Sequence, residues 1–216
     1  MDTTAARQQM VEQQIRTWEV LDPRVIGVLE RVPREQFVTP DYRELAFLDG
    51  PIPIGHGEIM LAPKVHGRIL QALSIEPGDK VLEVGTGTGY LTACLSLLSR
   101  ETASIEIHPD LAALAQANLR SVPGANATVA VHDAFGGAPL GAHDAIAVTG
   151  SLPVYDARFE QALTIGGRLF VVVGVAPVME ALLIRRVDGS EWVRETLFET
   201  VIPPLIGAAA AQRFVF

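Results

Sequence analysis

The first third of the chain carries apolar side chains at helical spacing. Val11, Ile15 and Trp18 recur at i, i+4 and i+7, so they share one face of a predicted helix. Asp22-Pro23 predicts the start of a second helix, because an acidic cap followed by proline favours the first helical turn. Residues 47–63 are rich in glycine and proline, and this density indicates an ordered loop with neither helix nor strand.

From Pro63 onward, short apolar runs alternate with stretches of helical periodicity. The pattern predicts helices over 63–73, 90–98 and 156–163 and from Pro109, and strands over 80–84, 103–107, 127–131, 144–149 and 167–173. Strands that alternate with helices are typical of a mostly parallel sheet with helices on both faces, which is the doubly wound α/β class.

The pattern changes after Gly174. Residues 182–187 and 192–201 flank the turn Asp188-Gly189 and predict a hairpin that completes the sheet in antiparallel fashion. The chain has no internal repeat and no linker rich in Ser and Gly, so a single domain over 1–216 is expected. Its end is apolar at Ala208–Ala211 and Phe214–Phe216, where a last strand and a partner contact both stay open.

Composition narrows the classes of partner. The 216 residues include 17 basic and 25 acidic side chains without a basic run, which argues against a nucleic-acid substrate. No apolar run approaches the roughly 18 residues of a membrane span, and the polar N-terminus lacks the pattern of a signal peptide. We therefore expect a cytoplasmic protein without a membrane segment. A lone Cys94 excludes an internal disulfide, and the histidines lack metal-ligand spacing.

The most informative segment is an apolar strand that runs straight into Gly85, Gly87 and Gly89 and then into a helix. In open α/β sheets, ligands bind at the carboxyl ends of the strands, and glycines let the backbone approach them closely. Glu106 ends the next strand, 21 residues after Gly85, where a carboxylate can accept hydrogen bonds from ribose hydroxyls. Asp133 follows the third strand and is placed for an adenine amino group.

The spacing decides between two classes of nucleoside cofactor. A dinucleotide fingerprint would need glycine where the chain has Tyr90 or Thr92, so an oxidoreductase that uses NAD is disfavoured. A loop preceded by Glu83 suits S-adenosylmethionine, which has no phosphate and carries an ammonium and a sulfonium. The residues predicted to bind this cofactor are Glu83, Gly85, Gly87, Gly89, Glu106, Ile107, Asp133, Ala134 and Phe135. Each acid also has a structural alternative, as a solvated strand end, a helix cap or a turn former.

Nearly the whole chain resembles the protein-L-isoaspartate (D-aspartate) O-methyltransferase family. The resemblance rests on the glycine loop and on the stretches 10–15, 32–38, 53–57 and 166–169, of which Pro-Ile-Gly-His-Gly at 53–57 is the most specific. It implies a Rossmann-like methyltransferase core over 63–216 behind a helical extension with a substrate loop over 1–62. It also implies S-adenosylmethionine as methyl donor and a carboxylate of isoaspartyl protein or peptide as acceptor.

The chain departs from the family at the substrate loop. Family members carry Gln-Thr-Ile-Ser-x-Pro after Gly-His-Gly, and the resemblance makes that Ser the active-site hydroxyl. Here Ile59 replaces the Thr and Leu61 replaces the Ser, while Pro63 keeps the register. Lys64 is a candidate for a substitute positive charge, with a solvated helix face as its alternative.

Three hypotheses follow from the sequence: an isoaspartyl methyltransferase, a methyltransferase for a different acceptor, and a catalytically impaired protein that binds S-adenosylmethionine. The oligomeric state stays open. His56, between two glycines, is interpreted as a loop-closing hydrogen-bonding residue in preference to a catalytic one.

Overall fold

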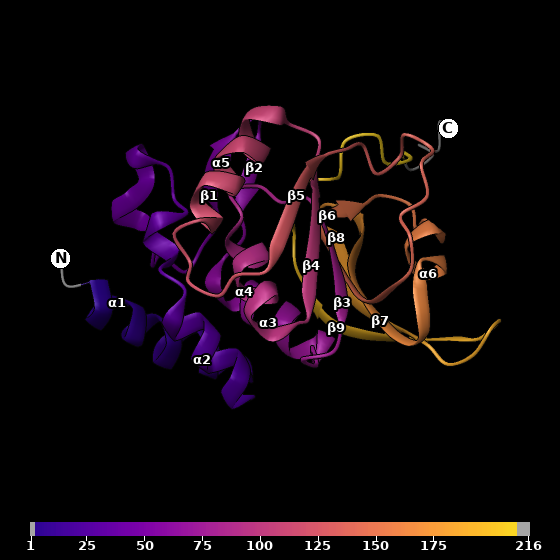
Figure 1. Cartoon of the computed structure of the whole chain (residues 1–216), viewed down its shortest axis with the longest axis horizontal. Helices are drawn as coiled ribbons and strands as arrows, with labels where there is room; N and C mark the ends of the chain where they lie inside the picture. Colours follow the sequence, from indigo (N-terminus) through magenta and orange to yellow (C-terminus); the bar gives the residue numbers. More distant parts are fainter. Residues whose placement is uncertain (1–2, 211–216) are drawn as a thin grey trace.

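A mixed β-sheet runs through the centre of the computed structural model, which describes residues 3–210 (Figure 1). Within these residues its strand order is β5-β4-β3-β6-β7-β8-β9. The strands are β3 (Lys80–Val84), β4 (Glu101–Glu106), β5 (Ala127–Val131), β6 (His143–Leu152), β7 (Leu163–Val175), β8 (Val178–Arg186) and β9 (Trp192–Glu199). The first five pair in parallel, and β8 and β9 add an antiparallel hairpin, as predicted. Phe214–Phe216 lie outside the described residues.

Helices precede or connect the parallel strands, and a proline opens two of the four. They are α3 (Pro63–Leu73), α4 (Tyr90–Leu98), α5 (Pro109–Leu119) and the short α6 (Arg158–Gln161). A proline at the first helical position costs no hydrogen bond, because that backbone N–H has no partner within the helix. The predicted bounds of α3 and α4 are confirmed, whereas α6 is shorter than the predicted 156–163. None of the helices within residues 3–210 is long and apolar enough to span a membrane.

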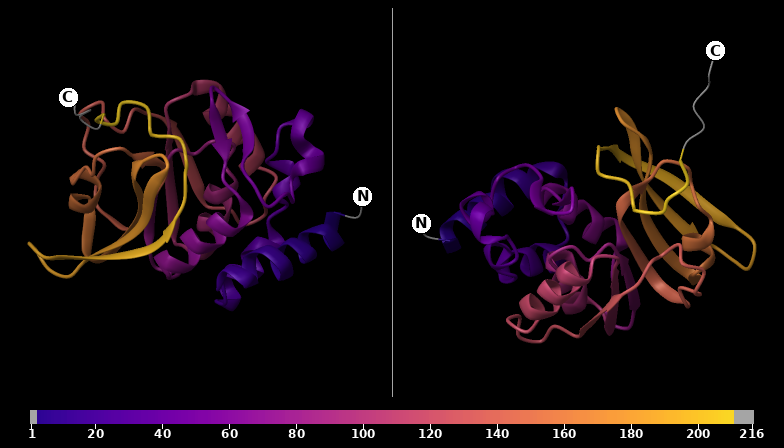
Figure 2. Two further views of the ribbon diagram at one scale, coloured as in Figure 1. Left: turned by 180° about the vertical axis from the view of Figure 1, so that it is seen from behind. Right: turned by 90° about the horizontal axis from the view of Figure 1, so that it is seen from above.

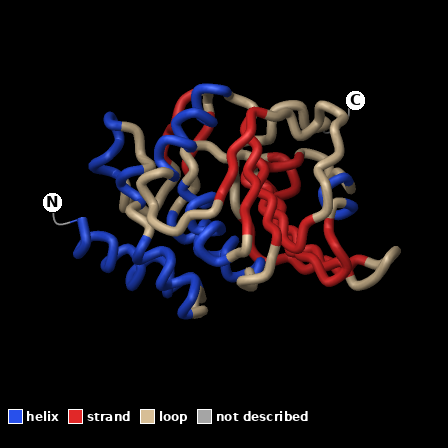
Figure 3. Tube along the Cα trace, in the orientation of Figure 1, coloured by secondary structure: helices blue, strands red, loops and turns tan. Residues whose placement is uncertain are grey.

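Side chains alternate between two apolar layers along each strand. Val81 faces a layer that includes α2 (Pro23–Arg31), α3, α4 and α5, while Leu82 faces a second layer that contains Phe159 of α6. The doubly wound class is confirmed, but the two faces are covered unequally. Loops and α6 cover the second face, and the N-terminal helices add to the first, which Figure 3 shows as a helical side and a strand-rich side.

The N-terminal extension begins with α1 (Thr3–Met10), which continues through the turns η1 (Val11–Ile15) and η2 (Arg16–Trp18). After α2, two short 3-10 helices follow, η3 (Arg34–Gln36) and η4 (Pro40–Leu45). Asp22 caps α2 by accepting a hydrogen bond from the backbone N–H of Arg24 at 2.8 Å. The two helices predicted from apolar spacing are therefore confirmed.

The prediction of a strandless loop over 47–63 is wrong. This segment forms an antiparallel hairpin from β1 (Ile52–Gly55) and β2 (Glu58–Met60), in which Ile52 lies opposite Met60. Ile52 and Ile54 point inward while Pro53 and Gly55 point outward, so the alternation of a strand is present despite the prolines. His56 has a φ of 56° at the turn, between two glycines that also have positive φ.

After β9 the chain passes across the carboxyl ends of the central strands (Figure 2). The backbone N–H of Leu205 donates to the carbonyl of Ser151 at 2.9 Å, which ties this C-terminal segment to β6. Residues far apart in sequence therefore share the end of the sheet where the glycine loop lies.

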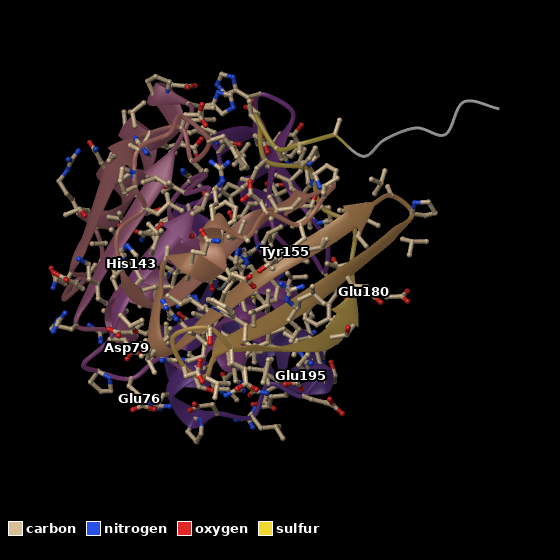
Figure 4. All side chains as sticks on the ribbon, turned by 90° about the vertical axis from the view of Figure 1, so that its right-hand side faces the viewer. Glu76, Asp79, His143, Tyr155, Glu180 and Glu195 are labelled. Carbon is tan, nitrogen blue, oxygen red and sulfur yellow. The ribbon has the colours of Figure 1, made fainter. Side chains whose placement is uncertain are left out.

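Arg168 of β7 braces the opposite end of the sheet. Its guanidinium donates to the carbonyls of Leu73 and Ser74 at 2.8 and 2.9 Å and forms an ion pair with Asp79 at 2.6 Å. Figure 4 labels Asp79 beside Glu76, in the turn that leads into β3. Arg168 therefore joins the C-terminus of α3 and the turn before β3 to β7.

We expect Arg168→Leu to lower the free energy of unfolding by about 2–4 kcal/mol, because three backbone carbonyls and a half-buried carboxylate lose their donor. Urea denaturation measures this change. The control is Arg185→Leu at the paired position on β8, which is exposed. Equal stability losses in the two variants would contradict the bracing role.

Candidate functional site

The glycine loop lies where the strand order reverses. The chain moves outward from β3 to β4 and β5 and then returns to place β6 on the other side of β3, so the connections after β3 and β6 leave in opposite directions and a crevice forms there. Gly85 has a φ of 96°, and a Cβ atom there would collide with the hydroxyl of Thr149 on β6. That hydroxyl donates to the carbonyl of Gly85 at 2.6 Å. Glycine is therefore required for the two strands to meet at this point.

Two contiguous cavities open at this crevice and share five residues: Ile54, Ile59, Gly85, Gly87 and Thr149. The larger encloses about 670 Å³ of space, a volume that includes its opening to solvent. We call it the nucleoside cavity, because Glu106, Ile107, Asp133, Ala134 and Phe135 line it. The smaller, which we call the methyl-side cavity, is lined by Glu83, Leu61 and His66 among others.

Eight of the nine residues predicted to bind the cofactor therefore line the two cavities. Gly89 does not. It caps α4 with a φ of 90°, and a Cβ atom there would lie 3.1 Å from the Cβ of Ala115 on α5. Its role is close packing between these two helices.

Glu106 is fixed at the end of β4 by backbone donors. One carboxylate oxygen accepts from the N–H of Gly87 at 2.8 Å, and the other accepts from the N–H of His108 at 3.0 Å. The side chain is buried yet lines the nucleoside cavity. Each oxygen keeps a further lone pair, so the carboxylate can accept from two neighbouring hydroxyls.

Asp133 and Phe135 form the far wall of the nucleoside cavity. The carboxylate of Asp133 accepts from the backbone N–H of Phe135 at 2.8 Å, so the residue is both a turn former and a cavity residue. Arg158 of α6 places its guanidinium 4.6 Å from the centre of the Phe135 ring and donates to the carbonyl of Ala134 at 3.1 Å. These contacts hold the ring against the cavity.

Glu83 is fully buried under the glycine loop. One carboxyl oxygen, Oε2, accepts hydrogen bonds from the hydroxyls of Thr92 and Ser104. The other, Oε1, has no partner within residues 3–210. Burial, with a smaller contribution from the nearby Glu106, raises the pKa of Glu83 to about 8. An unpartnered buried oxygen at a cavity wall fits a cationic ligand, which would restore the ionised form.

The hairpin β1–β2 covers the cavities from the other side. At its tip, His56 stacks on His108 with ring centres 4.0 Å apart, and its Nε2 lies 2.8 Å from a carboxylate oxygen of Asp110 on α5. The loop-closing interpretation of His56 agrees with these contacts. Glu58 on the same hairpin lines the nucleoside cavity, and burial raises the pKa of its carboxyl.

The two residues that replace the family's hydroxyls face the ligand space. Ile59 lines both cavities, and Leu61, which is 5% exposed, lines the methyl-side cavity. Lys64 lines neither of them. Its ammonium lies 3.0 Å from Asp49 and 4.6 Å from the ring centre of Trp18, so it is engaged at the surface of the N-terminal extension.

Several residues that line the cavities were not predicted as cofactor-binding residues from the sequence. His66 of α3 enters the methyl-side cavity because its helix packs behind the hairpin, and Pro203, Leu205 and Ile206 arrive from the C-terminal segment. A Cβ atom at Gly150 would lie 2.7 Å from a methyl carbon of Leu205, which shows how closely that segment packs on β6. A local pattern marks none of these contacts, because they join distant parts of the chain.

The lining of both cavities contains four carboxylates, from Glu58, Glu83, Glu106 and Asp133, and no Lys or Arg among the described residues. Such a charge pattern disfavours a phosphate ligand and favours a nucleoside with a cationic end.

The sequence pattern of the family described as protein-L-isoaspartate(D-aspartate) O-methyltransferase (PCMT) matches residues 5–209. The chain belongs to this family. A protein-L-isoaspartate O-methyltransferase of Koribacter versatilis is 37% identical over 202 residues, which are 93% of this chain and 90% of that protein. One of Aeropyrum pernix is 36% identical over 207 residues, which are 94% of this chain and 80% of that protein.

Solved structures of this family share the fold. A Plasmodium falciparum protein described as a beta-aspartate methyltransferase, in complex with S-adenosyl-L-homocysteine, matches with a TM-score of 0.79 at 20% identity. The match covers 95% of this chain and 98% of that one. A second protein-L-isoaspartate O-methyltransferase matches with a TM-score of 0.80 at 21% identity, over 94% and 67% of the two chains. The predicted Rossmann-like methyltransferase fold is thereby confirmed.

The raised pKa of Glu83 predicts a dependence of stability on pH. Between its ordinary value and about 8, the native protein holds one proton more than the unfolded chain. The free energy of unfolding should therefore fall as pH rises across this window, by up to about 1.4 kcal/mol per pH unit from this group. We expect Glu83→Gln to flatten the slope between pH 5 and 8 in urea titrations without ligand.

The matched control is Glu195→Gln on β9, which is exposed. It should keep the slope of the wild type. A Glu83→Gln protein with the wild-type slope would show that Glu83 is already ionised at low pH.

Proposed function

We propose that this protein transfers a methyl group from S-adenosylmethionine to the carboxylate of isoaspartyl residues in proteins or peptides. The observation that carries the proposal is the buried, unpartnered Oε1 of Glu83 in an acid-lined cavity at the glycine loop. Membership of the methyltransferase family supports it. The cofactor supplies an electrophilic methyl on a sulfonium, and the protein supplies binding and orientation.

In this proposal the cofactor extends across both cavities. Glu106 is placed to accept from the ribose hydroxyls, and Asp133 and Phe135 to bind the adenine. Glu83 then faces the methionyl end, where its free oxygen can accept from the ammonium. His66 lines the same cavity and can donate to the carboxylate of that end.

Methyl transfer to a carboxylate depends more on the orientation of the acceptor than on a general base. A carboxylate with a reference pKa of about 4 is already ionised at neutral pH, so no group has to remove a proton. Holding its oxygen in line with the methyl can supply about 7–11 kcal/mol, whereas one hydrogen bond to a charged group contributes about 1.5–3 kcal/mol. The loss of the hydroxyls at Ile59 and Leu61 is therefore compatible with methyl transfer.

The lining of the cavities bears on the acceptor class. A nucleic-acid acceptor is disfavoured, because a phosphate backbone needs Lys or Arg and the described lining has neither. We therefore propose a protein or peptide carboxylate as the acceptor. From the sequence pattern we propose the cytoplasm as the location of the reaction.

A second candidate function is methyl transfer to a different acceptor. The observation that favours it is the apolar wall of Ile59 and Leu61, which presents no side-chain donor at the family's hydroxyl positions. Desolvating a carboxylate against such a wall is costly unless backbone groups replace the donors.

Transfer of tritiated methyl groups to an isoaspartyl peptide tests the proposed function. We expect labelling of this peptide and none of the same peptide with ordinary aspartate. Glu106→Gln should raise the Kd for S-adenosylhomocysteine about tenfold or more, since hydrogen bonds to an ionised acceptor weaken. Cofactor binding without transfer to the isoaspartyl peptide would favour the second candidate, and absence of binding would refute both.

Restoring the hydroxyls should separate the two candidates. If an isoaspartyl carboxylate is the acceptor, the double variant Ile59→Thr, Leu61→Ser should raise kcat/KM about ten- to a hundredfold. The control is Ile59→Val, Leu61→Ala, which removes similar volume without adding a hydroxyl. A higher kcat/KM in both double variants would show that the smaller side chains act by making room for the acceptor. An unchanged kcat/KM in both would show that the hydroxyls do not limit transfer to the isoaspartyl peptide.

A further inference from the structure

Arg34 is a buried cation directly behind the methyl-side cavity. It belongs to η3 and is 0% exposed, and no carboxylate lies within ion-pair distance of it among residues 3–210. Its guanidinium donates to the carbonyl of Ala46 at 2.8 Å and to that of Leu61 at 2.7 Å. It also lies over the ring of Tyr90, 4.9 Å from its centre. A charge without a counter-ion is expensive to bury, so its position requires a reason.

Arg34 has a third partner, His66, and determines which tautomer this histidine adopts. Its Nη1 lies 3.1 Å from Nδ1 of His66. A guanidinium only donates hydrogen bonds, so Nδ1 must accept, and the imidazole is neutral with its proton on Nε2. The ring packs edge-on against Tyr90, with centres 5.1 Å apart. Its Nε2 makes no hydrogen bond within the described chain, and the residue lines the methyl-side cavity.

Arg34 therefore acts on two walls of one cavity. Through His66, which lines the cavity, it fixes the imidazole proton on Nε2, and through the carbonyl of Leu61 it holds the end of the substrate loop. Its uncompensated charge lies behind this wall, whereas Glu83 lines the same cavity. The methionyl end of the proposed cofactor has the matching pair of charges, an ammonium for Glu83 and a carboxylate for the side of His66 and Arg34.

We propose that Arg34 is a positioning residue for the cofactor: it holds His66 as an Nε2–H donor toward the methionyl carboxylate and anchors the loop at Leu61. This inference rests on the proposed function. It gives a role to a buried guanidinium whose burial without a counter-ion is otherwise unfavourable for folding. Lysine cannot replace it, since one ammonium cannot reach three acceptors with the geometry of a guanidinium fork.

The first experiment needs no variant. Nitrogen-15 NMR of the ligand-free wild type, labelled at histidine, should show Nδ1 of His66 unprotonated and Nε2 protonated at neutral pH. Addition of S-adenosylhomocysteine should shift the Nε2–H proton downfield. 5′-Methylthioadenosine, which lacks the amino-acid end, should not produce that shift. A proton on Nδ1, or equal shifts with both ligands, would overturn the proposal.

The second experiment compares the affinities of the same two ligands by calorimetry. Arg34→Met and Arg34→Lys should weaken S-adenosylhomocysteine about ten- to a hundredfold and leave 5′-methylthioadenosine within about twofold. The control is Arg31→Met, because Arg31 also donates to a backbone carbonyl, that of Pro123 at 2.7 Å, but lines neither cavity. It should change neither affinity.

The two ligands distinguish the possible failures. If the Arg34 variants weaken both ligands equally, or neither, Arg34 has only a structural role or none, and the proposed function stands. If the wild type binds neither ligand, the proposed function fails and this inference fails with it. Should both variants fail to fold, the wild-type NMR comparison decides the question.

Discussion

The site depends on the close approach of two strands at the point where the sheet reverses its order. Gly85 follows β3 so near to Thr149 of β6 that a side chain at position 85 would occupy the space of the Thr149 hydroxyl. That contact sets the path of the glycine loop, and the loop forms the floor of both cavities. Glu83 and Glu106 flank the same loop, so their geometry follows from the same constraint.

Charge is distributed unevenly around this floor. The described lining carries carboxylates without Lys or Arg, and the burial of Glu83 keeps its pKa high until a cation approaches. The guanidinium of Arg34 lies behind the methyl-side wall, where it contacts His66 and the carbonyl of Leu61. The proposed zwitterionic end of the ligand would meet Glu83 on one side and His66, backed by Arg34, on the other.

The β1–β2 hairpin forms the proposed acceptor side of the site. It contacts the core through a few apolar side chains, so charge contributes less to recognition there. Ile54 and Ile59 line both cavities, and His56 fastens the turn to α5. Specificity at such a wall comes mainly from shape and from backbone donors. Lys64, one residue beyond the family's proline, is directed to Asp49 instead of to the acceptor.

Local signals in the sequence determined the elements of the core: prolines that open α3 and α5, the apolar run of β3, and an acid at or near the end of each of three strands. They also indicated the cofactor class, because a glycine spacing is a local property. Only the tertiary structure decided that residues 52–60 pair as a hairpin, that Arg34 bonds His66, and that the C-terminal segment covers the nucleoside cavity. The physical reason is that these contacts join residues far apart in the chain, and their energies depend on packing that no local pattern records.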